Sequence, residues 1–255
     1  MNKVSEFVLR GFFKIVKKIP FTNNLDVSVL SGPLKGYKIN IQSLNSYILG
    51  LFENDAVDYL PDNNTDGKAI YDIGAHIGYF SMIFAQRSSK VYAFEPMPQN
   101  QNTIKKHLAL NKVDNVELQK VALSDKVGTV QFTVNAGDNS NTYKSESPFL
   151  NKKEIRLSTV EVKTDTVDNL IFGEKKLLPP ALLKIDVEGA EYDVLLGSKK
   201  TIDLYKPIIL LSTHDVHVVG VSKQCLLFLE NSGYSSELLV EHMKGMQDFY
   251  CKPIA

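Results

Sequence analysis

The sequence predicts an α/β fold, with a mostly parallel central sheet and helices on both of its faces. Three observations support this fold class. Short apolar runs typical of buried strands, such as Ala69–Tyr71 and Ala181–Ile185, alternate with segments of helical period. The first run leads into a turn with two glycines, Gly74 and Gly78, that opens a helix. The chain has 255 residues, which suits one such domain with appended elements better than two domains.

Residues 1–60 are expected to form an N-terminal segment that packs on the main domain, residues 61–255. The segment begins with a basic helix, and two short strands follow near Val27–Leu30 and Tyr37–Asn40. The helix is expected to pack its apolar stripe on the main domain. The alternative is a peripheral contact of residues 1–19 with the inner face of an anionic membrane. The stripe consists of Val4, Phe7, Val8, Phe12, Ile15, Val16 and Ile19.

The remaining elements follow from the same patterns. Strands are predicted from apolar or alternating runs and helices from a period of about 3.6 residues. The polar stretch Asn135–Lys153 is expected to be a surface loop. The further predicted strands are Val91–Phe94, Val116–Gln119, Gly128–Val134, Ser158–Lys163 and Pro207–Leu211. The further predicted helices are Phe52–Pro61, one after Gly78, Gln99–Leu110, one from Tyr192, and Lys223–Asn231.

Composition argues against nucleic acid as a partner. Lys and Arg together number 29, and so do Asp and Glu, which predicts no bulk attraction to a polyanion. No apolar stretch approaches the about 18 residues of a membrane-spanning helix, so we expect a cytoplasmic protein. Cys225 and Cys251 lack metal-type spacing and are expected to be free thiols in a reducing cytosol, the alternative being a disulfide between them.

The turn from Asp72 to Gly78 suggests a nucleotide site. A dinucleotide-binding turn has the spacing G-x-G-x-x-G, whereas this one reads D-x-G-x-x-x-G, with His76 between the glycines. Asp72 would repel a pyrophosphate but suits a cationic ligand such as S-adenosylmethionine (SAM), which carries an amino group beside a sulfonium. Glu95, at the end of the next strand, can accept hydrogen bonds from a ribose. The alternative is a structural turn whose glycines only permit tight packing.

Several motifs together resemble the FkbM family of SAM-dependent methyltransferases. They are DIGAHIGYFS, AFEP, VALSD, KTDTVDNL and LLKIDVEGAEYDVLLG, within a resemblance that runs from about Tyr47 to Tyr234. The resemblance implies a class I (Rossmann-like) methyltransferase fold and O-methylation, often of sugars or hydroxylated natural products. It also implies SAM binding by Asp72, Gly74, Gly78 and Glu95, with Ala122 near the adenine and Asp186 facing the transfer site. We add His76, where the family commonly has Asn, and Pro96 to this cofactor-binding set.

Asp186 and Glu188 follow the buried strand Ala181–Ile185, at a position where open α/β sheets bind ligands. Their carboxylates could orient a substrate hydroxyl or hold a divalent metal. The alternative is that Glu188 and Glu191 cap the following helix, which we favour for Glu191. Lys184 is expected to extend toward solvent or to pair with an acid.

His214 is the candidate proton acceptor or substrate contact at the end of the next strand. The family typically has an acid two residues before this His, but here Ser212 takes that position. The loss puts in doubt any metal or acid–base role that needs the acid. His217 is more readily explained as structural. Tyr47 and Glu53 are weaker candidates for cofactor contacts, and His107 and His242 are interpreted as surface residues.

The favoured function is SAM-dependent methylation of a hydroxyl on a sugar, glycan or glycolipid precursor. One alternative is a non-catalytic SAM-binding protein, suggested by Ser212. Another is an NAD-dependent oxidoreductase, disfavoured by Asp72 and the glycine spacing. The acceptor and the oligomeric state are left open.

Overall fold

The computed structural model describes residues 9, 11–13, 15–16, 19, 22, 25–43, 45–51, 57, 67–135, 141–142 and 157–254. For residues 133–135, 141–142 and 157–158 it describes the backbone alone. Most of the helix predicted over 52–61, and most of the loop predicted over 135–153, lie outside the described residues.

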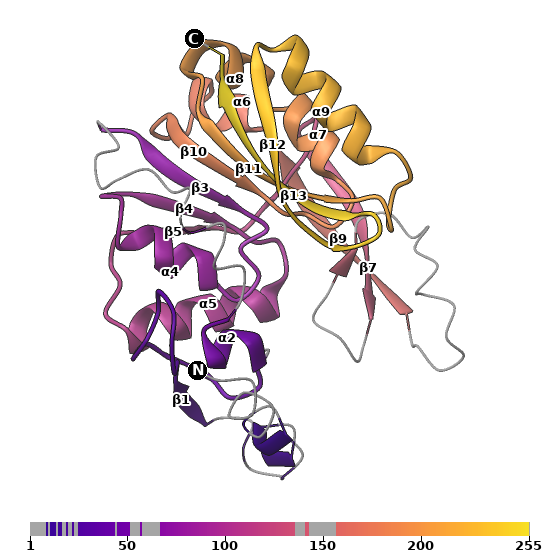
Figure 1. The fold of residues 1–255 in the computed structure, drawn as a ribbon. Coiled ribbons are helices and arrows are strands. Elements are labelled where there is room, and N and C mark those ends of the chain that lie inside the picture. The colour runs from indigo at the N-terminus through magenta and orange to yellow at the C-terminus, as the bar shows by residue number, and fades with distance from the viewer. Residues whose placement is uncertain are drawn as a thin grey trace.

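A seven-stranded sheet forms the centre of the fold (Figure 1). Its strands are β3 (Ala69–Ile73), β4 (Val91–Phe94), β5 (Val116–Gln119), β10 (Pro180–Ile185), β11 (Ile208–His214), β12 (Tyr234–Met243) and β13 (Met246–Pro253). The order across the sheet is β12-β13-β11-β10-β3-β4-β5. Strands β11, β10, β3, β4 and β5 run parallel, and β13 pairs antiparallel with both β11 and β12. The mostly parallel α/β fold is therefore confirmed.

Helices cover both faces of this sheet, so its central strands are apolar on both sides. The helices are α2 (Asn45–Leu49), α4 (Tyr79–Ala85), α5 (Pro98–Leu110), α6 (Val167–Phe172), α7 (Glu191–Leu196), α8 (Lys199–Tyr205) and α9 (Val221–Asn231). On one face, Tyr71, Leu183 and Leu211 pack with residues of α6, α7, α8 and α9. On the other, Ile70 and Leu182 pack with α2 and α4 (Figure 1). The pattern predicted α4, α5, α7 and α9 but not α2, α6 or α8.

The N-terminal segment packs against the α4 side of the sheet. It contains β1 (Asp26–Ser28) and β2 (Lys38–Asn40), an antiparallel pair where two strands are predicted. Residues 11–13 and 15–16 are helical, and Phe13 is buried in the same cluster as α4. The residues of the predicted apolar stripe are not all buried, because only one face of a helix can turn inward. Phe12, Ile15 and Ile19 lie 56%, 68% and 50% exposed.

A second, four-stranded sheet adjoins the central one, in the order β6-β9-β7-β8 (Figure 1). Its strands are β6 (Ala122–Leu123), β7 (Gly128–Asn135), β8 (Asn141–Thr142) and β9 (Leu157–Asp165). Strands β7 and β9 are predicted, whereas β8 lies within the stretch predicted as a loop, which is a correction. The β12–β13 hairpin is likewise absent from the predictions.

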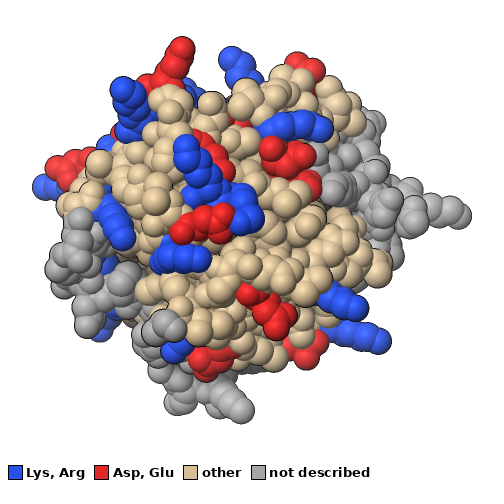
Figure 2. Space-filling view, turned by 90° about the horizontal axis from the view of Figure 1, so that it is seen from above, with Lys and Arg blue, Asp and Glu red and all other residues tan. Residues whose placement is uncertain are grey.

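Charge on the surface is mixed. Basic and acidic side chains are interspersed over the face that Figure 2 shows, in keeping with their equal numbers in the sequence. Within the described parts of the chain, no helix has the length and apolar character needed to cross a membrane.

Candidate active site

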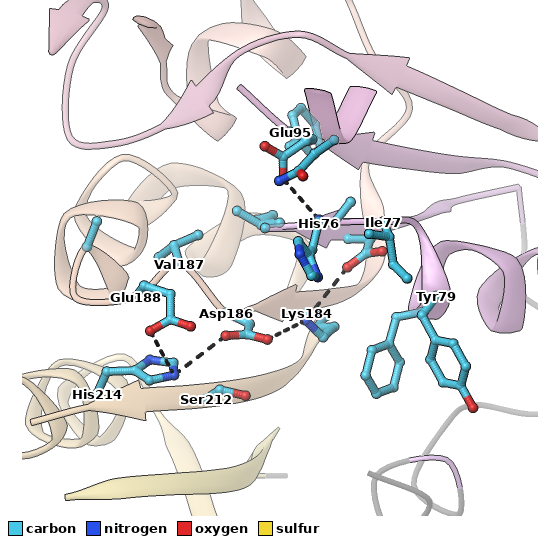
Figure 3. Close-up of a pocket in the computed structure, with 18 of the residues that line it drawn as sticks. His76, Ile77, Tyr79, Glu95, Lys184, Asp186, Val187, Glu188, Ser212 and His214 are labelled. Atoms are coloured by element: carbon cyan, nitrogen blue, oxygen red, sulfur yellow. Dashed lines mark hydrogen bonds and ion pairs between the residues drawn. The ribbon is translucent and has the colours of Figure 1, made fainter. Parts of the chain in front are cut away.

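A cavity of about 1090 Å³ lies at the carboxyl ends of β3, β4, β10 and β11. This edge is where ligands bind in open α/β sheets, and the volume is large for a small-molecule site. Most of the residues selected from the sequence line it: Asp72, Gly74, His76, Glu95, Pro96, Ala122, Asp186, Glu188 and His214. Figure 3 labels His76, Glu95, Asp186, Glu188 and His214 among them. Gly78 is not among the lining residues.

The two turn glycines have packing reasons of their own. Gly74 has φ +85°, and a Cβ there would lie 1.8 Å from the carbonyl oxygen of Asp186. Gly78 has φ +79°, and its Cβ would meet Cγ1 of Ile104 in α5 at 3.3 Å. Glycine is the residue that tolerates both the left-handed backbone and such close approach. Gly78 therefore fits the structural interpretation, whereas Gly74 also brings Asp186 beside the turn in the cavity wall.

Asp72 is fully buried and lines the cavity. Its Oδ2 accepts a 2.5 Å hydrogen bond from Oγ of Ser81. Its Oδ1 has no hydrogen-bond partner among the described residues, although Nζ of Lys184 lies 3.8 Å away. Burial raises the pKa of Asp72, against the lowering effect of Lys184. A buried carboxylate with an oxygen left over suits a cationic ligand group.

Lys184 links two acids, which confirms the expectation that it pairs with one. Its β10 position is the register partner of Asp72 on β3. Its Nζ lies 3.0 Å from Oδ2 of Asp186. The cation therefore bridges Asp72 and Asp186. Figure 3 shows its contact with Asp186.

Glu95 directly follows β4 and is held by backbone amides. Its Oε2 accepts the N–H of His76 at 2.9 Å, and its Oε1 accepts the N–H of Met97 at 2.8 Å. Burial raises the pKa of Glu95 to about 7, although these hydrogen bonds favour the ionised form. The side chain is thus fixed in the cavity wall, with lone pairs left for further donors.

Three carboxylates surround His214 at the end of β11. Figure 3 shows two of them, Asp186 and Glu188. Its Nδ1 lies 2.7 Å from Oε1 of Glu191. Its Nε2 lies 3.7 Å from Oδ1 of Asp186 and 3.8 Å from Oε2 of Glu188. Glu191 is fully buried as the first residue of α7 and also accepts the N–H of Gly189 at 2.9 Å. Helix capping alone, the interpretation favoured from the sequence, misses the contact of Glu191 with His214.

These carboxylates decide the charge of His214. Burial by itself lowers its pKa, but the hydrogen bond with Glu191 and the charges of Glu188 and Asp186 raise the pKa to about 10. Burial would raise the pKa of Asp186, but Lys184 and then His214 lower it. The carboxylates therefore favour the protonated form of His214, and Lys184 and His214 favour the ionised form of Asp186. The role of His214 as a proton acceptor or substrate contact stays a prediction.

A second histidine–acid pair faces the same cavity, on the β12–β13 hairpin. Nε2 of His242 lies 2.6 Å from Oδ2 of Asp248, and both residues line the cavity. His242 is exposed, in agreement with its interpretation as a surface residue, but it also contributes to the cavity wall. The pair was not predicted from the sequence, because the β12–β13 hairpin brings it to the cavity. The one local signal of this hairpin is Lys244-Gly245 at its turn.

The weaker candidates have different outcomes. Tyr47 lines the cavity and stacks on Tyr79 with ring centroids 4.6 Å apart, whereas Glu53 lies outside the described residues. His217 contacts Oε2 of Glu188 through Nε2 at 2.7 Å. His107 is fully buried, with Nε2 accepting the N–H of Asn40 at 2.9 Å, so its surface interpretation is wrong.

Known proteins resemble this chain in sequence and in fold. The methyltransferase FkbM domain matches residues 72–236. "Methyltransferase 1" of Beauveria bassiana is 28% identical over 197 residues, covering 72% of this chain and 76% of that protein. "Hexuronic acid methyltransferase AglP" of Haloferax volcanii is 23% identical over 187 residues, covering 73% and 71%. "2-O-methyltransferase NoeI" of Sinorhizobium fredii is 28% identical over 144 residues, covering 52% and 58%.

A solved structure of methyltransferase FkbM from Methylobacillus flagellatus shares the fold. It superposes with a TM-score of 0.51 at 16% identity, over 78% of this chain and 46% of that one. The domain match covers well over half of the chain and includes the cavity residues from Asp72 to His214. The chain belongs to the methyltransferase FkbM family.

Proposed function

We propose that this protein transfers a methyl group from SAM to a hydroxyl of a sugar, glycan or glycolipid precursor. Membership of a methyltransferase family supports the reaction type. The names of two relatives, a 2-O-methyltransferase and a hexuronic acid methyltransferase, support hydroxyl-bearing sugars as the acceptor class. The cavity supports the proposal that SAM and an acceptor bind together, because distinct groups of polar residues lie in its wall.

The observation that carries the proposal is the unsatisfied Oδ1 of buried Asp72. Buried polar atoms are normally hydrogen-bonded, so this oxygen suits the amino group of the methionine end of SAM. Glu95, fixed by two amides at the end of the neighbouring strand, suits the ribose hydroxyls. Pro96 and Ala122 line the same cavity and would offer apolar surface to the adenine. When bound, SAM supplies an electrophilic methyl group on its sulfonium.

The residues on the opposite side of the glycine turn would position the acceptor. Asp186 is ionised and directed at the cavity, so it can accept a hydrogen bond from an acceptor hydroxyl. Lys184 holds one of its oxygens at 3.0 Å, which limits the orientations of the carboxylate. Holding two reactants in line can lower a barrier by up to about 7–11 kcal/mol, and this alignment is the main contribution we assign to the chain.

The test is to incubate the purified protein with SAM and a panel of free sugars, uronic acids and glycolipid precursors. Formation of S-adenosylhomocysteine together with an acceptor heavier by one methyl group is the expected result. Binding of SAM by calorimetry without turnover on any acceptor would instead favour a non-catalytic SAM-binding protein. Binding of NADH in preference to SAM would refute the proposal.

A further inference from the structure

Three side chains at the cavity form a cluster with the spacing of metal ligands. Asp186 and Glu188 follow β10, and His214 ends β11. One ligand atom from each lies within 4.8 Å of the others. Nε2 of His214 is 3.7 Å from Asp186 and 3.8 Å from Glu188, too far for hydrogen bonds. Ligands about 2.1 Å from one octahedral cation lie about 3.0 to 4.2 Å apart, and these two distances fall within that range.

Glu191 provides a second, independent observation. Its fully buried carboxylate holds Nδ1 of His214 at 2.7 Å. A histidine that binds a metal almost always contacts a carboxylate or carbonyl through its other ring nitrogen, which orients the ring. Here that contact directs Nε2 toward Asp186 and Glu188 (Figure 3). Burying the charged carboxylate of Glu191 costs free energy. We therefore interpret its contact with His214 as a sign that the orientation of the ring is important.

The backbone is left-handed at Glu188 and at the residue after it. Glu188 has φ +55° and Gly189 has φ +106°. A left-handed backbone is unfavourable for glutamate, and such strain is typically retained at functional sites. Each acid is also anchored by one further partner. Lys184 contacts Oδ2 of Asp186 at 3.0 Å, and His217 contacts Oε2 of Glu188 at 2.7 Å.

We propose that Asp186, Glu188 and His214 bind a divalent first-row metal ion, with Mn²⁺ as the best match. Two carboxylates and one imidazole suit Mn²⁺ better than Ca²⁺ or Mg²⁺, which prefer oxygen ligands throughout. With three protein ligands, the ion keeps positions for water or for an acceptor hydroxyl, whose pKa it would lower. This role for the ion rests on the proposed function, whereas the binding site itself does not.

The first experiment uses the unaltered protein and Mn²⁺ alone. Protein freed of metal with a chelator is titrated with Mn²⁺, and the free ion is followed by electron paramagnetic resonance. One bound ion per chain at micromolar concentrations is expected. With ¹⁵N-labelled histidine, bound Mn²⁺ should broaden the ring signals of His214 and His217 before that of His107, which contacts Asn40 in the N-terminal segment. Absence of binding below millimolar Mn²⁺, or equal broadening of all histidines, would overturn the proposal.

Variants then assign the ligands. Glu188→Gln and His214→Gln should each weaken Mn²⁺ binding by about 100-fold, and Glu191→Gln, which alters the contact that orients the ring, by about 10- to 100-fold. His242→Gln is the matched control, because it alters a histidine paired with an acid in the same cavity outside the cluster. Thermal unfolding of each variant checks the fold. Unchanged affinity in Glu188→Gln and His214→Gln would refute the site even if SAM-dependent methylation were established. Mn²⁺ binding without any methylation would retain the site and refute the proposed function.

Discussion

Ser212 and Asp248 are cross-strand partners in the antiparallel ladder between β11 and β13. Directly opposed residues place their side chains on the same face of a sheet, and both line the cavity. The sequence alone shows an acid missing at Ser212, two residues before His214. In the structure, β13 places the carboxylate of Asp248 beside that position. Asp248 also contacts His242 at 2.6 Å.

The first prediction follows from this hairpin. Asp248→Asn and His242→Gln should raise KM for the acceptor by about 10- to 100-fold, because each removes a charge-assisted hydrogen bond from the cavity wall. The affinity for SAM should stay within about twofold, since Asp72 and Glu95 are untouched. Steady-state kinetics with calorimetry measures both quantities. A loss of SAM affinity equal to the change in KM would place the pair on the cofactor side instead.

The second prediction concerns Asp72. Asp72→Asn should weaken SAM binding by about 100-fold or more, because it removes the negative charge of a buried group that lies 3.8 Å from Nζ of Lys184. Calorimetric titration with SAM checks this. Asp168→Asn is the matched control, since Asp168 accepts the N–H groups of Lys200 and Thr201 at 2.9 and 2.8 Å. The control should lower the free energy of unfolding and leave SAM affinity unchanged. Micromolar SAM affinity retained in Asp72→Asn would contradict the cofactor assignment.

The third prediction is a pH dependence set by Glu95, whose pKa is raised by burial to about 7. Because the ionised carboxylate accepts hydrogen bonds from the ribose better, SAM affinity should fall as the pH drops below about 7. Glu95→Gln should weaken binding and flatten this part of the profile. Calorimetry between pH 5.5 and about 8 measures it. The same slope in the variant would assign the dependence to another group.

The contribution of Glu95 to the free energy of unfolding of the ligand-free protein should decrease as the pH rises, whereas SAM affinity should increase. The folded pKa of Glu95 lies above the ordinary value of 4.5, so the folded state binds more protons between these two values. The contribution of Glu95 is therefore present at low pH and is lost as the pH rises through about 7. Comparing the free energies of unfolding of the protein and of Glu95→Gln across this range isolates the effect. A difference that does not vary with pH would contradict the raised pKa.

The fourth prediction concerns Gly74. Gly74→Ala should lower the free energy of unfolding by about 3 kcal/mol or more, because its Cβ would lie 1.8 Å from the carbonyl oxygen of Asp186. Gly36→Ala is the matched control, since Gly36 has φ +88° but nothing within 4 Å of the added Cβ. The control should cost only about 1–2 kcal/mol of backbone strain. Denaturant unfolding measures both. Equal losses of unfolding free energy in the two variants would show that the strand end moves to accommodate the alanine side chain.

Local patterns in the sequence account for the central nucleotide-binding unit. The run before Asp72, the glycine turn and the strand ending before Glu95 each show in a few consecutive residues, and β4 and β5 have the predicted bounds. Parallel strands end at one edge of a sheet, so Asp72, Glu95 and Asp186 could be assigned to one site before any coordinates. The buried face of the N-terminal helix could not be predicted, because residues 11–16 are apolar on more than one side. Only packing selects the face with Phe13.

The tertiary structure decided the contacts between residues far apart in the chain. Asp72 and Lys184 become partners through the β3–β10 register, and Ser212 and Asp248 through the β11–β13 register. A register depends on the whole sheet and leaves no mark in short stretches of sequence. Burial then changed what the side chains do: Glu191, which as a sequence feature resembles a helix cap, holds His214 in the fold. The sequence was enough to identify the family and the edge of the sheet that carries the site. Long-range pairing set the charges and partners within that site, because electrostatic effects depend on burial and distance.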